Sequence, residues 1–236
     1  MSTVAYLVRH GEVEHHRSDI AITARGREQA ASAADALADR IAEGDTVSVC
    51  HAPVNRVRET AEIVYARLLA RRIPRVSLRP PQIDLALSNV RFTFRSDDGD
   101  RLEEPSQLYE EINDAAYLKN IPQARVDFYG GFWKSADPMG YWLTHDSGGG
   151  AETPASVLCR FQERLKTIVD ADGVGQTRTH SILVTHSGAM RAVLRHAFGS
   201  DPGEPEFCGI ITIEQSARIL QPTLTYQGRS APLKLD

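Results

Sequence analysis

The sequence predicts an α/β fold, a three-layer α/β/α sandwich around a mostly parallel central sheet. Three short apolar runs carry this prediction, because each has the length of a buried strand and is followed by a helical pattern. The runs are Val4–Val8, Thr46–Cys50 and Ser181–Thr185. A histidine or an Arg-His pair follows each of them. Since the carboxyl ends of parallel strands line one crevice, these polar residues are expected to converge.

The first half of the chain alternates strands with helices. After the first strand, Thr23 is the expected N-cap of a helix from Gly26 to about Ala42, which Gly44-Asp45 ends. The second strand leads into a helix from about Val54 to Arg72, whose apolar residues recur on one face. Pro74 lies just beyond the end of that helix, where proline is common.

The last part of the chain repeats the pattern. A helix is expected from Thr153-Pro154, as N-cap and first residue, to about Val169. The third strand follows, then a helix from Gly188 to Phe198 with Gly199 as its stop signal. Two closing strands, Gly209–Glu214 and Arg218–Gln221, are expected to complete the fold.

Between about Ser88 and Gly150 the pattern loosens. We interpret this stretch as an insertion, about 88–150, within a single domain that spans residues 1–236. It is rich in aromatic residues, and Tyr109–Leu118 is a candidate helix. We expect the insertion to fold over the carboxyl edge of the sheet as a lid or substrate wall. A satellite hydrophobic cluster without a ligand role is the alternative.

The composition excludes several classes of protein. A formal net charge of -4 gives no reason to expect nucleic acid or an anionic membrane as a partner. The three cysteines are widely spaced and form no CxxC pair, which is typical of a reduced, cytoplasmic protein. No signal peptide is recognisable, and no segment approaches the roughly 20 apolar residues of a membrane span.

The strand ends predict a site for a phosphoryl group. Arg9 and His10 follow the first strand, His51 and Arg56 the second, and His186 the third. A phosphate monoester carries close to two negative charges, which arginine forks bind with charge-assisted hydrogen bonds. Histidine is a neutral nucleophile at neutral pH, because its unperturbed pKa is about 6.5.

Five segments in order resemble the histidine phosphatase superfamily, the phosphoglycerate-mutase-like proteins. They are Leu7–Glu12, Ile22–Ala30, Ala52–Ala61, Gly150–Thr153 and Val184–Arg191. Their counterparts in the family are the RHG signature and the segments LTxxGxxQA, SPxxRxxQTA, GGES and VxHGGxxR. A lone RHG triplet is weak, but five segments in this order are specific.

The resemblance implies that His10 attacks phosphorus in line and becomes a phosphohistidine, which water then hydrolyses. Arg9, Arg56 and His186 would hold the phosphoryl oxygens. Thr23 is expected both to cap its helix and to be a candidate for substrate contact. The residues implied for substrate binding lie in or beside the matching segments: Arg9, His16, Thr23, Arg56, His186, Ser187 and Gly188.

The general acid is less clear. In much of the family a glutamate in an LxE segment, not far after the second arginine, supplies the proton for the leaving group. Here the window Pro81–Ser88 has no glutamate. If the register slips, Asp84 is the acid. Otherwise a carboxyl group of the insertion takes its place, or the chain lacks an acid and favours good leaving groups. The carboxyl candidates of the insertion are Glu103, Glu104 and Asp114.

The sequence therefore predicts a metal-independent phosphomonoesterase that acts on a small phosphorylated metabolite and needs no cofactor. His10, His15, His16 and Asp19 lack the helical i, i+4 spacing of a zinc motif. A mutase that returns the phosphoryl group to its substrate is one alternative, and a catalytically lapsed scaffold that binds phosphorylated ligands is another. The identity of the substrate and the oligomeric state, a homodimer included, are left open.

Overall fold

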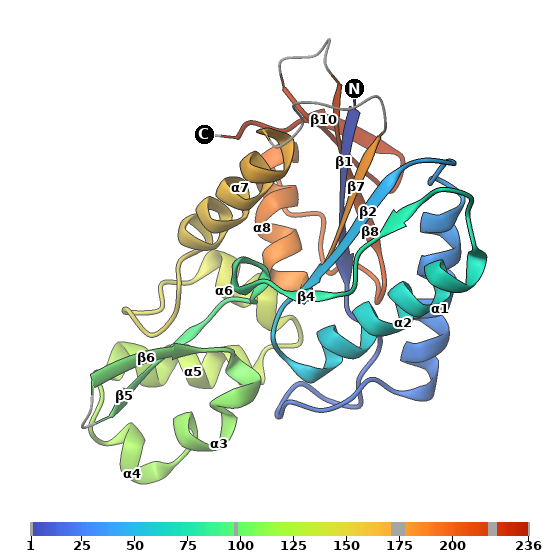
Figure 1. The fold of residues 1–236 in the computed structure, drawn as a ribbon. Coiled ribbons are helices and arrows are strands. Elements are labelled where there is room, and N and C mark those ends of the chain that lie inside the picture. The colour runs from blue at the N-terminus through green and yellow to red at the C-terminus, as the bar shows by residue number, and fades with distance from the viewer. Residues whose placement is uncertain (1, 97–98, 171–177, 217–220, 236) are drawn as a thin grey trace.

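The computed structural model describes residues 2–96, 99–170, 178–216 and 221–235, and a β-sheet with helices on both faces forms its centre (Figure 1). The strands of this sheet are β1 (Ser2–Arg9), β2 (Thr46–His51), β3 (Ser77–Leu78), β4 (Gln82–Ile83), β7 (Thr179–Thr185), β8 (Ile210–Ser216), β9 (Thr223–Tyr226) and β10 (Arg229–Pro232). Within the described residues their order is β10-β9-β8-β1-β7-β2-β3, with β4 paired to β2.

The sheet is mixed and, as the sequence predicts, more of its strand pairings are parallel than antiparallel among the described residues. Strands β1, β7 and β2 pair in parallel, as do β3 and β4 with β2. Strand β8 pairs antiparallel with β1, β9 pairs antiparallel with β8, and β10 pairs antiparallel with β9. The sequence analysis misses the closing hairpin of β9 and β10, whose turn residues Gln227 and Gly228 both have positive φ. Most of the expected strand Arg218–Gln221 lies outside the described residues.

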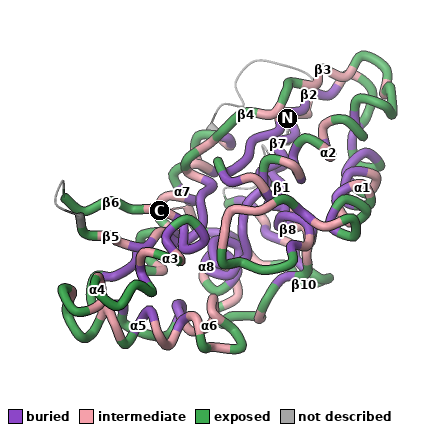
Figure 2. Tube along the Cα trace, turned by 90° about the horizontal axis from the view of Figure 1, so that it is seen from below, coloured by how far each residue is buried: buried purple, intermediate pink, exposed green. Residues whose placement is uncertain are grey.

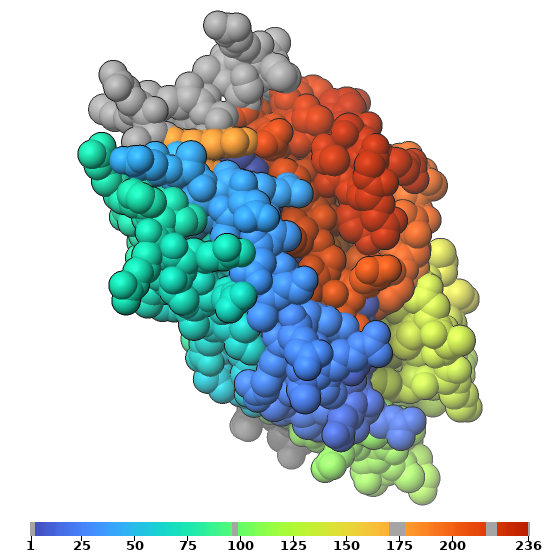
Figure 3. Space-filling view, turned by 90° about the vertical axis from the view of Figure 1, so that its right-hand side faces the viewer, coloured from blue at the N-terminus to red at the C-terminus, as the bar shows by residue number. Residues whose placement is uncertain are grey.

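Two helices cover each face of the sheet (Figure 1). They are α1 (Ala24–Ala38) and α2 (Asn55–Arg71) on one face, and α7 (Pro154–Asp170) and α8 (Ser187–Phe198) on the other. On the side shown in Figure 3, the blue segment that includes α1 lies between the cyan segment that includes α2 and the red segment of the last strands. The bounds of α2, α7 and α8 agree with the sequence prediction within about one residue.

Helix α1 is shorter than the sequence predicts. Thr23 caps it as expected, since its hydroxyl accepts a hydrogen bond from the Gly26 amide. The helix ends at Ala38 and not at Ala42, because the Ala42 amide donates to the carboxylate of Asp45 at 2.8 Å. A side chain that binds a nearby backbone group in this way competes with the helical ladder.

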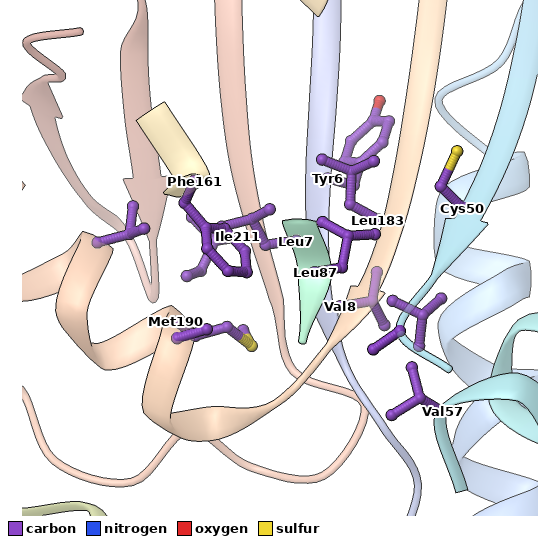
Figure 4. Close-up of a cluster of buried hydrophobic side chains, with 14 of the residues drawn as sticks. Tyr6, Leu7, Val8, Cys50, Val57, Leu87, Phe161, Leu183, Met190 and Ile211 are labelled. Carbon is purple, nitrogen blue, oxygen red and sulfur yellow. The ribbon is translucent and has the colours of Figure 1, made fainter. Parts of the chain in front are cut away.

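The centre of the sheet is a dry core. Strand β1 is buried along its length, and helix α8 is buried over most of its turns (Figure 2). Figure 4 shows Leu7, Ile211 and Met190 gathered near one another, with Val57 approaching Val8 from the opposite helix layer. Each fully buried side chain of this size contributes about 1.5–3 kcal/mol. This packing fixes the strand ends on which the polar residues stand.

The insertion folds as a small α/β unit beside the carboxyl ends of β1, β2 and β7 (Figure 1). Its elements, with the two 3₁₀ turns that precede and interrupt it, are η1 (Leu85–Leu87), β5 (Phe92–Ser96), β6 (Gly99–Glu103), η2 (Pro105–Gln107), α3 (Tyr109–Ile112), α4 (Ala115–Leu118), α5 (Gln123–Lys134) and α6 (Pro138–Thr144). The expected helix Tyr109–Leu118 is broken in two, because the carboxylate of Asp114 caps α4 at the amides of Ala116 and Tyr117.

The buried aromatic residues of the insertion pack into the same hydrophobic core as the central sheet. Phe92 lies 4.9 Å from Phe132 and 5.4 Å from Tyr129, ring centre to ring centre, and all three are buried. Trp133, next along α5, instead lines a cavity at the carboxyl edge of the sheet. The aromatic residues of the insertion therefore do not form a separate satellite cluster, and a lid or substrate wall stays a prediction. No helix of the described residues is long and apolar enough to cross a membrane.

Candidate active site

His10 stands at the end of β1, where its amide continues the sheet by donating to the carbonyl of Thr185. Its side chain is 2% exposed, and Nδ1 lies 2.8 Å from the carbonyl oxygen of Gly11. Because a carbonyl only accepts, Nδ1 carries the proton and Nε2 keeps its lone pair. Burial, together with the positive charges of Arg56 and the neighbouring His186, lowers the pKa of His10 well below 6.5. His10 is thus a neutral imidazole with a free nitrogen.

The loop after His10 is tied to both helices of one face. Gly11 approaches α1 so closely that a Cβ on it would lie 2.6 Å from the carbonyl oxygen of Gly26. The amide of Gly11 donates to the hydroxyl of Thr60, which in turn donates to the carbonyl of Arg56. This chain of bonds fixes the position of His10 relative to the start of α2.

Arg56 lies in the first turn of α2 and is 3% exposed. It donates to Oε2 of Glu104 at 3.0 Å and to the hydroxyl of Ser106 at 3.1 Å. One of its terminal nitrogens also lies 3.4 Å from Nδ1 of His186. Its Nε has no partner among the described residues and remains available as a donor.

Glu104 joins Arg56 to His186. Its Oε1 lies 3.1 Å from Nε2 of His186 and accepts from the amide of Asn89 at 3.1 Å. Burial alone raises the pKa of Glu104, but the charges and hydrogen bonds of His186 and Arg56 outweigh it and bring the pKa to about 2. Burial lowers the pKa of His186, partly offset by the carboxylate of Glu104. Without a ligand, Glu104 is therefore ionised.

Arg9 ends β1 beside His10 and contributes to the lowered pKa of that histidine. Its guanidinium group, however, is bound by the segment that precedes β8. It pairs with Glu204 at 2.8 Å, donates to the carbonyl of Pro205 and stacks on the ring of Phe207 at 4.0 Å. Arg9 is not among the residues that line the cavity, although its buried Nε has no partner among the described residues.

His10, Arg56 and His186 line a cavity of about 290 Å³, and Glu104 lies behind Arg56 and His186, outside the lining. The walls of the cavity come from the ends of β1 and β7, the start of α2, the insertion, and the segment before β8. The lining residues are His10, His16, Arg56, Asn89, Pro105, Ser106, Trp133, Ala136, Asp137, Pro138, Met139, His186, Ser187 and Glu204. Helix α8 begins at this cavity, so its first free amides add positive potential.

The structure brings together most of the residues that the sequence predicts. His16 lines the cavity with its ring 5.7 Å from that of His10, and Ser187 lines it at the start of α8. Gly188 lies directly behind, where a Cβ would lie 2.7 Å from Oδ1 of Asn89. Thr23 is not among the lining residues, and its hydroxyl instead donates to Glu12. His51 also lies outside the lining.

Asp84 is the predicted residue that the structure does not bring to the cavity. Its carboxylate caps the 3₁₀ turn η1 at the Ala86 amide and pairs with Arg164 of α7. Both oxygens are thus engaged in holding the connection between β4 and the insertion. Glu104, one of the alternatives, instead contacts Arg56 and His186, which line the cavity.

We expect Asp84→Asn to affect stability and not turnover. The pair with Arg164 is only about a quarter or less exposed on each side, so its loss lowers the free energy of unfolding by about 1 kcal/mol. Denaturant unfolding measures this change. Phosphate release from aryl and alkyl phosphates should stay within about twofold of wild type. A selective loss on alkyl phosphates would restore Asp84 as the acid.

The signal for Glu104 was present in the sequence. Leu102-Glu103-Glu104 fits the LxE pattern of the family but lies far beyond the expected window. The strands β5 and β6 account for the displacement, since this hairpin precedes Glu104 in the chain. The described residues hold no group of three or more His, Cys, Asp or Glu side chains able to bind a metal ion.

Comparison with known proteins agrees with this arrangement. The model of the histidine phosphatase superfamily (branch 1) matches residues 5–79, which include His10 and Arg56. A search of curated proteins found no match.

Three solved structures illustrate the similarity in fold. Bacillus stearothermophilus YhfR is 21% identical, with 96% of each chain covered and a TM-score of 0.55. A mycobacterial glucosyl-3-phosphoglycerate phosphatase is 17% identical, with 97% of this chain and 99% of that chain covered and a TM-score of 0.55. A phosphoglycerate mutase from Bacillus anthracis is 16% identical, with 97% and 92% covered and a TM-score of 0.55.

The fold is similar to that of a phosphoglycerate mutase and of a phosphatase, and a histidine stands at the end of its first strand. The model of the histidine phosphatase superfamily matches about a third of the chain, the part that carries His10 and Arg56.

Proposed function

We propose that this protein is a metal-independent phosphatase that hydrolyses phosphate monoesters of small metabolites through a phosphohistidine at His10. The observation that carries the proposal is the state of His10. It is neutral, its Nδ1 proton is held by Gly11, and Nε2 is free beside Arg56 and His186. A nucleophile of this kind needs no further base to remove a proton.

The first half-reaction forms the bond between Nε2 of His10 and phosphorus and breaks the bond to the leaving oxygen. Charge that spreads over the phosphoryl oxygens is stabilised by Arg56, by His186 and by the amides at the start of α8. A phosphoryl group next to Arg56 competes with Glu104 for positive charge and raises the pKa of that carboxyl. Glu104 then carries a proton, which the leaving oxygen takes.

The second half-reaction uses the same groups in reverse. Glu104, now a carboxylate, accepts a proton from the attacking water, and the phosphorus–nitrogen bond breaks. Inorganic phosphate leaves and His10 regains its lone pair. Hydrolysis of phosphate monoesters without a bisphosphate primer tests the proposal. Transfer to a second substrate molecule with no phosphate release would indicate a mutase, and no His10-dependent turnover would indicate a lapsed phosphate-binding protein.

The pH dependence of kcat/KM follows from the lowered pKa of His10. The profile of kcat/KM reports the ionisations of the free enzyme and the free substrate. Because burial lowers the pKa of His10 below 6.5, the imidazole stays neutral as the pH falls through that value. We expect the acid limb with an aryl phosphate to lie below pH 6.5. A limb centred at or above pH 6.5 would show that His10 titrates as an ordinary histidine.

EDTA is expected to leave the rate unchanged, because guanidinium groups and not a metal ion hold the phosphoryl charge in this mechanism. The measurement is phosphate release after prolonged incubation with millimolar chelator, followed by addition of Mg²⁺, Mn²⁺ or Zn²⁺. A loss of activity that one of these ions reverses would contradict the mechanism.

A further inference from the structure

The wall that faces the phosphoryl site is acidic. Asp137, between α5 and α6, and Glu204, before β8, both line the cavity, with side chains 51% and 41% exposed. The two carboxylates lie side by side, since each contacts the same terminal nitrogen of Arg191, at 2.5 Å and 3.2 Å. Asp201 binds the same guanidinium group from outside the cavity lining. Three carboxylates therefore share Arg191.

The positive charges of the site are already matched. The ion pairs in and behind the cavity are Arg56 with Glu104 and Asp19, Arg9 with Glu204, and Arg191 with Asp137, Asp201 and Glu204. Five carboxylates thus meet three guanidinium groups. A phosphoryl group brings close to two further negative charges. A substrate with a positive charge of its own relieves this excess.

In the described part of the chain, the unpartnered polar atoms of the wall include a donor, Nε1 of Trp133, and an acceptor. Asn89 lines the cavity, is 6% exposed, and its Oδ1 has no partner among the described residues. Of the described residues that line the cavity, Arg56 is the one arginine or lysine, and it belongs to the phosphoryl site. Trp133 adds an aromatic surface to the cavity lining that also holds Asp137, and aromatic faces attract cations. A carboxylate or second phosphate on the substrate would compete with the phosphoryl group for Arg56.

We infer that the leaving group of the substrate carries an ammonium group bound at Asp137 and Glu204, so that the substrate is the phosphate ester of an amino alcohol. This inference rests on the proposed phosphatase function and narrows its substrate class. Asp137 and Glu204 select the substrate and take no part in the transfer of the phosphoryl group.

Three esters of nearly equal size test the inference: ethanolamine phosphate, propyl phosphate and phosphoglycolate, which are cationic, neutral and anionic beyond the phosphate. We expect kcat/KM to fall at least about tenfold from ethanolamine phosphate to propyl phosphate. From propyl phosphate to phosphoglycolate it should fall at least about tenfold again. Equal values, or a preference for propyl phosphate or phosphoglycolate, would overturn it. An aryl phosphate measured in parallel separates the two proposals: His10-dependent turnover of it keeps the phosphatase function even when the preference is absent.

Matched variants locate the effect. Asp137→Asn is expected to reduce the preference for ethanolamine phosphate over propyl phosphate at least about fivefold. Asp201→Asn perturbs the same arginine from outside the cavity and should keep that preference within about twofold. An equal change in both variants would mean that Asp137 acts through Arg191, and the inference would fail. If Asp137→Asn does not fold, Glu204→Gln is compared with Asp201→Asn by the same ratio and the same criterion.

Discussion

His10→Ala is expected to lower phosphate release from an aryl phosphate by at least about 10³-fold, as removal of a catalytic nucleophile does elsewhere. Without the imidazole no covalent bond to phosphorus forms, while Arg56 and His186 remain in place. Binding of inorganic phosphate, measured by calorimetry, should therefore change by less than about fivefold. The split between lost turnover and retained binding distinguishes a missing nucleophile from a collapsed site.

His15→Ala is the matched control, because His15 lies in the same loop but is exposed and outside the cavity lining. It should retain full activity. Rapid-quench labelling of the wild type should give an acid-labile, alkali-stable adduct that His10→Ala lacks. Residual turnover of His10→Ala within about tenfold of wild type, at equal melting temperature, would remove His10 as the nucleophile.

Much of the site could be predicted from the sequence because it depends on strand ends. His10, Arg56 and His186 each follow an apolar run within a few residues, and a parallel sheet brings such positions together whatever the rest of the chain does. The caps of α1 and α7 were predictable for a similar reason. Thr23 and Thr153 act on amides three residues away, so local sequence is sufficient to define them.

The features that the sequence left open or did not indicate depend on long-range placement. Glu104 reaches Arg56 because the chain between them includes the hairpin of β5 and β6. The hairpin lengthens the sequence spacing between Arg56 and the acidic residue, and the expectation for Asp84 relied on a shorter spacing. The acidic wall joins Asp137 to Glu204 through Arg191, across more than 50 positions of sequence, and no local pattern announces it. The turn at Gln227-Gly228 has the conformation of a tight hairpin, but Gln is a weaker signal there than Asn or Asp.

Glu104→Gln is expected to separate substrates by their leaving groups. An alkoxide needs a proton as it departs, and a general acid contributes about 10²–10⁴-fold to such a step. We therefore expect kcat for an alkyl phosphate to fall by that factor. With p-nitrophenyl phosphate, whose leaving group is stable as an anion, the loss should stay below about tenfold.

The substitution also removes the charge of the Glu104 side chain, which is about 3% exposed and lies between Arg56 and His186. Breaking such a pair costs stability, so the melting temperature is measured alongside the rates. Glu103→Gln is the control, since Glu103 precedes Glu104 directly but pairs with Arg101 on the insertion's own hairpin. A structural role for Glu104 would lower both rates by one factor. A steeper dependence of kcat on the pKa of the leaving group, seen in Glu104→Gln but not in Glu103→Gln, indicates that a proton donor is lost. That result requires Glu104 to contact the departing oxygen.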